Sequence, residues 1–175
     1  IAIAGGLGSF EPRKPKLEGI EEYEDKGVAY FIKDPEVYRD KKVVIAGGGD
    51  SALDWSIFLA DIASEVTLVH RRNEFRGALD SVEQVQELKL LNKINLITPA
   101  EITALHGENK IEGVEVTKDG KTQILEADAF IPLFGLSPKL GPIGDWGLEI
   151  EKNAIKVNNR FVHSLLTLGD YTFWY

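Results

Sequence analysis

Composition and charge narrow the classes of protein that this sequence can encode. The chain has 175 residues, 43% of them hydrophobic and 27% charged, which is enough for one ordinary domain with a hydrophobic core. Its formal net charge of −8 argues against nucleic acid and anionic membranes as partners, and no apolar run could cross a bilayer. The absence of cysteine excludes disulfides, thiolate metal ligands and a dithiol redox centre within these residues. Three widely spaced histidines lack the spacing of a metal site, so we predict none.

The start of the chain shows no targeting signal. Ile1 is not preceded by Met, and no basic segment of the kind that opens a secretory signal follows it. We therefore expect a cytoplasmic protein, and the missing Met suggests a fragment or a processed chain.

The first forty residues predict little regular structure. Residues 1–10 have the pattern of a buried strand that runs into a glycine-rich loop. Residues 11–16 contain two prolines and predict a connector, whose basic residues we expect on a solvated face or, less often, in a patch for an acidic partner. Residues 27–32 predict a short strand, and residues 34–38 one helical turn begun by Asp34 and Pro35.

A glycine-rich turn between a strand and a helix is the main feature of the sequence. Residues 43–45 are β-branched, three glycines follow, and residues 51–63 have the periodicity of an amphipathic helix. This pattern, G-x-G-x-x-G/A, is typical of a turn that binds the pyrophosphate of a dinucleotide, although a glycine-rich turn can also lack a ligand. Small residues let the chain turn, let backbone approach phosphate and let the helix pack closely, while the helix start offers free N–H groups. The candidate binding residues here are Gly47, Gly48, Gly49, Asp50, Ser51 and Ala52.

The following segments predict the fold class. Strands at 65–69 and 94–98 and a helix at 80–88 extend the turn into a βαβαβ unit with a parallel sheet. Residues 111–126 alternate around an Asp-Gly turn and predict an inserted antiparallel hairpin. Residues 127–135 then return as a strand, for which Pro132 favours an edge position, before a loop at 136–139 and a short strand and turn at 155–160. We predict an α/β, Rossmann-like, three-layer ββα domain with a parallel sheet and an inserted antiparallel hairpin or meander.

The end of the second strand carries positive charge. NAD-binding folds usually place an acidic residue there for the ribose 2′-hydroxyl, but this chain has Arg71 and Arg72, with Arg76 shortly after. Planar guanidinium groups suit a 2′-phosphate because they can form paired, charge-assisted hydrogen bonds. The pattern favours NADP(H) over NAD(H), the alternative being a basic strand end that faces water.

These residues carry a family resemblance. Residues 47–55, with residues 70–76 downstream, resemble the NADPH domain of the thioredoxin reductase-like flavoproteins, and within that group the ferredoxin–NADP reductases. Residues 6–13 resemble the segment that leaves the FAD domain in this family, and residues 168–170 the Gly-Asp that meets FAD. The resemblance adds His70, Phe134, Gly135 and Asp170 to the candidate cofactor-binding residues. It divides the chain into a remnant of the FAD domain with a linker at 1–20, an NADP(H)-binding domain at 21–158, and a remnant that re-enters the FAD domain at 159–175.

The resemblance implies a reductase, with two departures from the family pattern. Residues 30–34 stand where thioredoxin reductases have Cys-x-x-Cys, which favours the ferredoxin or flavodoxin reductases, and the tail at 161–175 is aromatic where the family has a helix of small residues. The implied function is hydride transfer from NADPH to FAD in an intact enzyme, a possible homodimer, that passes electrons to ferredoxin or flavodoxin. The reaction needs no side chain that acts as acid or base. Segments 19–27 and 156–160 would be the hinges of a domain rotation. This fragment alone should be inactive. The alternatives are an isolated NADP(H)-binding module and a related flavoprotein with another acceptor.

Overall fold

The computed structural model describes residues 9–151 and 154–157. Contacts divide the chain into two compact units, one of residues 12–135 and one of residues 1–11 with 136–175. The first unit contains two α-helices, α1 (Asp50–Leu59) and α2 (Leu79–Leu90), and most of the strands. Two short 3-10 helices precede them, η1 (Ile20–Tyr23) and η2 (Pro35–Tyr38). The Asp34 carboxylate accepts a hydrogen bond from Glu36 N at 3.0 Å, which confirms the predicted turn at 34–38.

A parallel sheet of four strands forms the centre of the 12–135 unit. Its strands are β2 (Lys42–Gly47), β3 (Glu65–Val69), β4 (Asn95–Ile97) and β8 (Ala129–Leu133), in the order β4-β3-β2-β8. Every neighbouring pair is parallel, with Val44 opposite Thr67 of β3 and Phe130 of β8. The predicted βαβαβ unit is confirmed, and β8 lies at the edge of the sheet, as Pro132 predicted.

Alternate residues of the central strands enter two different cores. Val43 and Ile45 of β2 pack with α1 and α2, whose contribution includes Leu53, Leu59 and Val85. Val44 and Ala46 pack on the opposite face, in a cluster that includes Phe130. Since successive side chains of a strand point to opposite faces, a strand covered on both sides is apolar on both faces, as β2 is from Val43 to Ala46.

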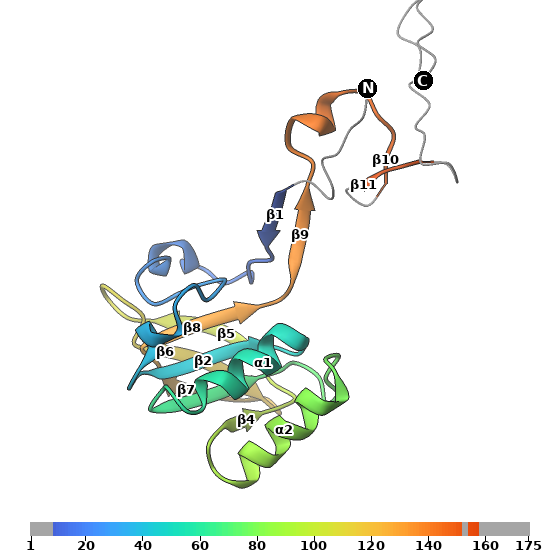
Figure 1. Cartoon of the computed structure of the whole chain (residues 1–175). Coiled ribbons are helices and arrows are strands. Elements are labelled where there is room, and N and C mark those ends of the chain that lie inside the picture. The colour runs from blue at the N-terminus through green and yellow to red at the C-terminus, as the bar shows by residue number, and fades with distance from the viewer. Residues whose placement is uncertain (1–8, 152–153, 158–175) are drawn as a thin grey trace, which may run out of the picture. The chain divides into compact units, whose positions relative to one another are not determined.

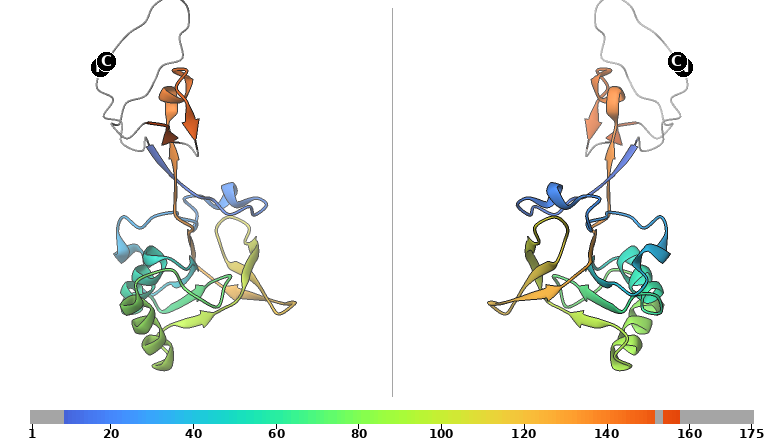
Figure 2. Two further views of the ribbon diagram at one scale, coloured as in Figure 1. Left: turned by 90° about the vertical axis from the view of Figure 1, so that its right-hand side faces the viewer. Right: turned by 90° about the vertical axis from the view of Figure 1, so that its left-hand side faces the viewer.

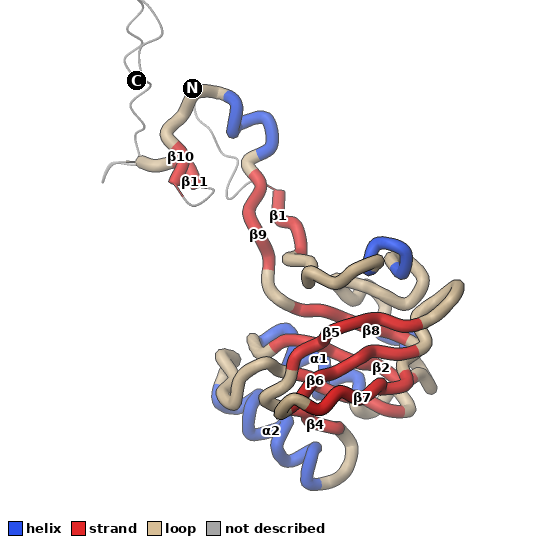
Figure 3. The backbone as a smooth tube through the Cα atoms, turned by 180° about the vertical axis from the view of Figure 1, so that it is seen from behind, coloured by secondary structure: helices blue, strands red, loops and turns tan. Residues whose placement is uncertain are grey.

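Three antiparallel strands cover the second face. They are β5 (Glu101–His106), β6 (Gly113–Lys118) and β7 (Lys121–Glu126), paired in the order β5-β6-β7. The helices and the parallel sheet stand out in Figure 1, and the antiparallel strands lie in front when the molecule is seen from behind (Figure 3). Figure 2 shows the helices on one side of the parallel sheet and β5–β7 on the other. The predicted α/β fold with three layers is therefore confirmed, and the inserted element is a three-stranded meander.

The second unit has little regular structure in its described part. β1 (Ser9–Pro12) pairs with β9 (Leu136–Lys139), and β10 (Ile150–Glu151) pairs with β11 (Ala154–Ile155) after a 3-10 helix, η3 (Gly141–Asp145). The loop predicted at 136–139 is thus wrong, because these residues pair with β1. The predictions for residues 1–8 and 158–160 lie outside the described residues.

Two further predictions need correction. Residues 27–32 do not form a strand. Val28 makes isolated bridges to Glu24 and Phe130, the second through hydrogen bonds from Phe130 N to Gly27 O and from Ala29 N to Phe130 O. The next donor on that edge of β8 would be Pro132, which has no N–H, so the ladder stops. Helix α1 ends at Leu59, four residues before the predicted end. His106 lies at the end of β5 with its side chain part-exposed, and its Nε2 is 3.4 Å from Glu115 Oε2.

Candidate functional site

The three glycines at the carboxyl end of β2 meet different surroundings. A Cβ added at Gly47 would lie 2.7 Å from Ala52 Cβ and 2.7 Å from Leu133 O, so only glycine lets β2, β8 and α1 meet there. A Cβ at Gly48 would lie 2.1 Å from His70 Cε1. A Cβ at Gly49 would meet no protein atom within 4 Å, so this position opens onto free space. The first two glycines are needed by the protein itself, whereas the third leaves room for a ligand.

The amino end of α1 is available for a ligand. Its N-cap, Gly49, is extended and provides no side-chain cap, and the first intrahelical bonds run from Ala52 N and Leu53 N to Gly49 O. The N–H groups of Asp50 and Ser51 therefore precede the hydrogen-bonded part of the helix, and the helix dipole adds positive potential. An anion at this end would meet backbone donors, as in known phosphate sites.

The arginine-bearing loop is fixed to the glycine turn and the start of α1 by one backbone and one side-chain hydrogen bond. Arg76 N donates to Gly48 O at 2.7 Å, and Ala78 N donates to Asp50 Oδ1 at 2.7 Å. Between them, a Cβ on Gly77 would lie 2.5 Å from Leu53 Cδ1, so the loop touches α1 closely. The Asp50 carboxylate thus holds the loop that follows β3, and the two predicted parts of the site are one connected structure.

His70 supports this structure from inside. Its side chain is buried, its Nε2 lies 3.1 Å from Glu74 O, and its ring stacks on Phe75 with centroids 5.0 Å apart. Burial is the largest effect and lowers the pKa of His70; the contact with Glu74 O raises it by less, and the charges of the neighbouring arginines lower it further. Neutral imidazole therefore fills the space beneath Gly48, and His70 contributes to the site by holding the turn and the loop together.

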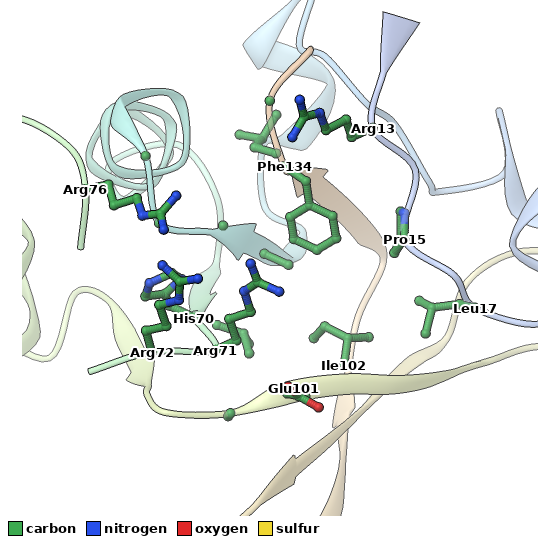
Figure 4. Close-up of a pocket in the computed structure, with 18 of the residues that line it drawn as sticks. Arg13, Pro15, Leu17, His70, Arg71, Arg72, Arg76, Glu101, Ile102 and Phe134 are labelled. Atoms are coloured by element: carbon green, nitrogen blue, oxygen red, sulfur yellow. The ribbon is translucent and has the colours of Figure 1, made fainter. Parts of the chain in front are cut away.

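A cavity of about 730 Å³ lies over the carboxyl ends of β3, β2 and β8. Figure 4 shows Arg71, Arg72 and Arg76 on one side of it and Arg13 with Phe134 on another. One carboxylate, that of Glu101, is among the lining groups. The cavity thus concentrates positive charge in a chain whose net charge is −8, and it suits a polyanion. The lining residues are Arg13, Pro15, Lys16, Leu17, Ala46, Gly47, Gly48, Gly49, Val69, His70, Arg71, Arg72, Arg76, Ala100, Glu101, Ile102, Leu133, Phe134 and Gly135.

The structure brings together most of the predicted site residues. The three glycines, His70, the three arginines, Phe134 and Gly135 all line the cavity. Asp50, Ser51 and Ala52 form the first turn of α1 beside it. Asp170 lies outside the described residues. In the part of the chain that the structure describes, no cluster of three or more His, Cys, Asp or Glu could hold a metal ion, and no helix there is long and apolar enough to cross a membrane.

Sequence reasoning missed the wall formed by residues 13–17. The basic residues of this connector were expected on a solvated face or in a patch for an acidic partner. Arg13 and Lys16 are exposed, as expected, but they also line the cavity, which the sequence did not indicate. The signal lay in the two prolines, which favour an extended segment, because alternate residues of an extended segment share a side. Glu101 and Ile102 were also missed, since the strand that carries them was not predicted.

Taken together, the fold and the cavity define a class of protein: a Rossmann-type α/β domain with its cavity at the carboxyl ends of parallel strands, beside a glycine turn. Residues 2–172 match the family model described as pyridine nucleotide-disulphide oxidoreductase, and the chain belongs to this family. Family membership agrees with the resemblance stated from the sequence.

Curated relatives and solved structures agree with this assignment. The chain is 74% identical to a ferredoxin–NADP reductase of Flavobacterium johnsoniae, over 97% of this chain and 50% of the relative. It is 66% identical to ferredoxin–NADP reductase 1 of Christiangramia forsetii, over 98% of this chain and 49% of the relative. The thioredoxin reductase of Lactococcus lactis matches 89% of this chain with 52% of its own, at 26% identity and a TM-score of 0.76. The chain thus spans about half the length of the curated relatives it matches.

Proposed function

We propose that this chain is the NADP(H)-binding part of a flavoprotein reductase of the ferredoxin–NADP reductase type. The observation that carries the proposal is the connected arrangement of an open glycine turn, an uncapped helix start and three arginines around one cavity. The relatives named ferredoxin–NADP reductase, at 74% and 66% identity, support the reaction class. Their greater length means that the whole reaction belongs to the intact enzyme.

The residues present fit NADPH. The free space at Gly49 and the N–H groups of Asp50 and Ser51 would receive the pyrophosphate, with the Ser51 hydroxyl beside them. The guanidinium groups of Arg71 and Arg72, with Arg76, would pair with the 2′-phosphate. Bound NADPH supplies the hydride, so the task of these residues is to bind and orient it.

Other parts of the proposal concern the rest of the enzyme. We propose that residues 21–158 are the NADP(H)-binding domain, that residues 1–20 are the end of the FAD-binding part and the linker that follows it, and that residues 159–175 re-enter the FAD-binding part, where Asp170 would meet FAD. Ferredoxin or flavodoxin would be the electron acceptor, and the intact enzyme a homodimer. The absence of cysteine from the chain means that it has no dithiol to reduce a disulfide, which supports a protein acceptor of this kind.

A binding module without turnover is the second candidate. It is favoured by the cavity, because the lining residues that the structure describes all belong to the 12–135 unit. Purified protein separates the two readings. Flavin absorbance with NADPH-dependent dye reduction would support turnover, and a colourless protein that binds NADPH would support the module. Reduction of ferredoxin, flavodoxin and quinones, compared in the intact enzyme, would identify the acceptor.

The 2′-phosphate assignment is tested by Arg71→Ala with Arg72→Ala. A hydrogen bond to a charged group is worth about 1.5–3 kcal/mol, so NADPH should bind at least about tenfold more weakly while NADH binding changes little. Arg39→Ala is the matched control, because the Arg39 guanidinium is bound to Glu36 and does not line the cavity. An equal loss for NADPH and NADH in calorimetry would contradict the assignment.

A further inference from the structure

The connector at residues 13–17 forms a wall of the cavity that the assigned site does not use. Arg13, Pro15 and Leu17 all border the cavity in Figure 4, and Arg13 is seen near Phe134, across from the other arginines. The backbone of Arg13 is fixed there, because its N–H donates to Gly135 O at 3.0 Å. The backbone that carries this guanidinium group is therefore fixed just after the carboxyl end of β8, on the opposite side of β2 from the arginines that follow β3.

A second set of contacts holds this connector against the body of the unit. Lys14 Nζ lies 2.5 Å from Glu24 Oε1 and 5.1 Å from the centroid of the Tyr30 ring, and Tyr30 Oη donates to Glu24 Oε1 at 2.9 Å. We call Lys14, Glu24 and Tyr30 the clasp. The hydrogen bonds from Lys14 and Tyr30 lower the pKa of Glu24, and burial with the Glu24 bond raises that of Tyr30. The carboxylate therefore stays ionised and the phenol stays protonated at neutral pH, so the clasp keeps its charge pattern.

The order of the strands indicates which part of a dinucleotide meets Arg13. The sheet runs β3-β2-β8 across the cavity. The 2′-phosphate arginines follow β3, and the glycine turn with the start of α1 follows β2. A dinucleotide anchored at these two strand ends continues toward β8, where Phe134 and Arg13 line the cavity. The adenosine half would thus bind at the end of β3, and the nicotinamide mononucleotide half would lie at the end of β8.

We propose that Arg13 binds the nicotinamide mononucleotide half of NADP(H), and that the clasp positions it. This inference rests on the proposed function and adds a binding residue to it. The phosphate of that half carries a negative charge, and its ribose carries hydroxyls, both of which a guanidinium group can bind. Lys14 does not line the cavity and acts through Arg13, because it ties the same connector to Glu24 and Tyr30. The alternative is that Arg13 is a fourth arginine that binds the 2′-phosphate, and the experiment below distinguishes these two roles.

Calorimetry of the full chain with two ligands tests the proposal. NADP⁺ contains both halves, whereas 2′,5′-ADP contains the adenosine half with its 2′-phosphate. Arg13→Ala should weaken NADP⁺ binding by about tenfold or more and leave 2′,5′-ADP binding within about twofold. Arg13→Gln serves as a second variant if thermal melting shows that Arg13→Ala does not fold, and Arg39→Ala is the control that should change neither affinity.

A second variant tests whether the clasp positions Arg13. Lys14→Met should weaken NADP⁺ binding by a smaller factor and should leave 2′,5′-ADP binding unchanged. In the Arg13→Ala background the same change should have no further effect, because the two residues act in series. An independent, additive loss would show that Lys14 does not act through Arg13, and would overturn the positioning role.

The outcomes separate this inference from the function on which it rests. No binding of either ligand by the folded wild-type chain would overturn the proposed function. Binding of both ligands by the wild type, with equal losses in the Arg13 variants, would make Arg13 a 2′-phosphate residue and overturn the inference alone. Unchanged NADP⁺ binding in the Arg13 variants would overturn it as well.

Discussion

Gly49→Ala and Gly47→Ala should separate ligand binding from folding, although both change the same turn. A Cβ at Gly49 enters open space, and its backbone, with φ −103° and ψ −179°, is allowed for alanine. Alanine is a poorer N-cap than glycine by roughly 0.5–1 kcal/mol, but it also restricts the unfolded chain, which stabilises by about 0.4–1 kcal/mol. The free energy of unfolding should therefore stay almost constant.

The effect on binding should be large for Gly49→Ala. The new methyl group occupies the space through which the pyrophosphate would approach, and losing one charge-assisted hydrogen bond weakens binding by about 10- to 150-fold. Gly47→Ala instead drives Cβ to 2.7 Å from Ala52 Cβ and Leu133 O. Overpacking of this kind costs about 1–3 kcal/mol, which lowers the melting temperature by about 2–12 °C in a chain of this size.

Thermal melting without ligand and calorimetry with NADP⁺ measure the two effects on each variant. Gly49→Ala should melt within about 2 °C of the wild type and bind weakly. If it binds NADP⁺ as tightly as the wild type, the glycine turn is not the phosphate site. If it melts at as low a temperature as Gly47→Ala, a Cβ at position 49 does not enter open space.

Two further predictions concern charge in the cavity. His70 has a lowered pKa, so the folded protein binds fewer protons there than the unfolded chain, whose value is near 6.5. The stability that this residue contributes should be full above pH 6.5 and should fall as the pH drops through the lowered pKa. In His70→Gln, the free energy of unfolding measured with urea should therefore depend less on pH between about pH 7 and 5. Identical slopes in variant and wild type would refute this. Glu101→Gln removes the carboxylate from the basic cavity; two unit charges about 8 Å apart in water interact by about 0.5 kcal/mol, so NADP⁺ should bind about twofold more tightly at low salt. Calorimetry at two salt concentrations checks it, and a gain that persists at high salt would contradict an electrostatic origin.

The glycine turn and the arginine pair were predictable because short sequence patterns set both. The strand, turn and helix around Gly47 depend on neighbouring residues, and the charges at Arg71 and Arg72 follow directly from the chain after β3. The apolar run at residues 43–45 is typical of a buried strand, and in the structure its side chains enter two cores, one on each face of the sheet. The roles of the glycine turn and of Arg71 and Arg72 in cofactor binding stay predictions.

Contacts between distant segments account for what the sequence did not reveal. β5 was missed because a bulge between Ile102 and Ala104 breaks its alternation, so that Ile102 and Leu105, three residues apart, both pack in the same core. The strand expected at 27–32 failed because its partner has a proline at the next bonding position, more than a hundred residues away. The place of Arg13 depends on Gly135, which no local pattern connects with it.

The hydrogen bond from Arg76 N to Gly48 O has a consequence for how this protein can evolve. It fixes the path of the loop through main-chain atoms, which every amino acid except proline supplies. Mutation can therefore replace the guanidinium groups along that loop one at a time while the scaffold is inherited unchanged. The preference between nicotinamide coenzymes can thus change by substitution of side chains while the backbone of the cavity stays the same.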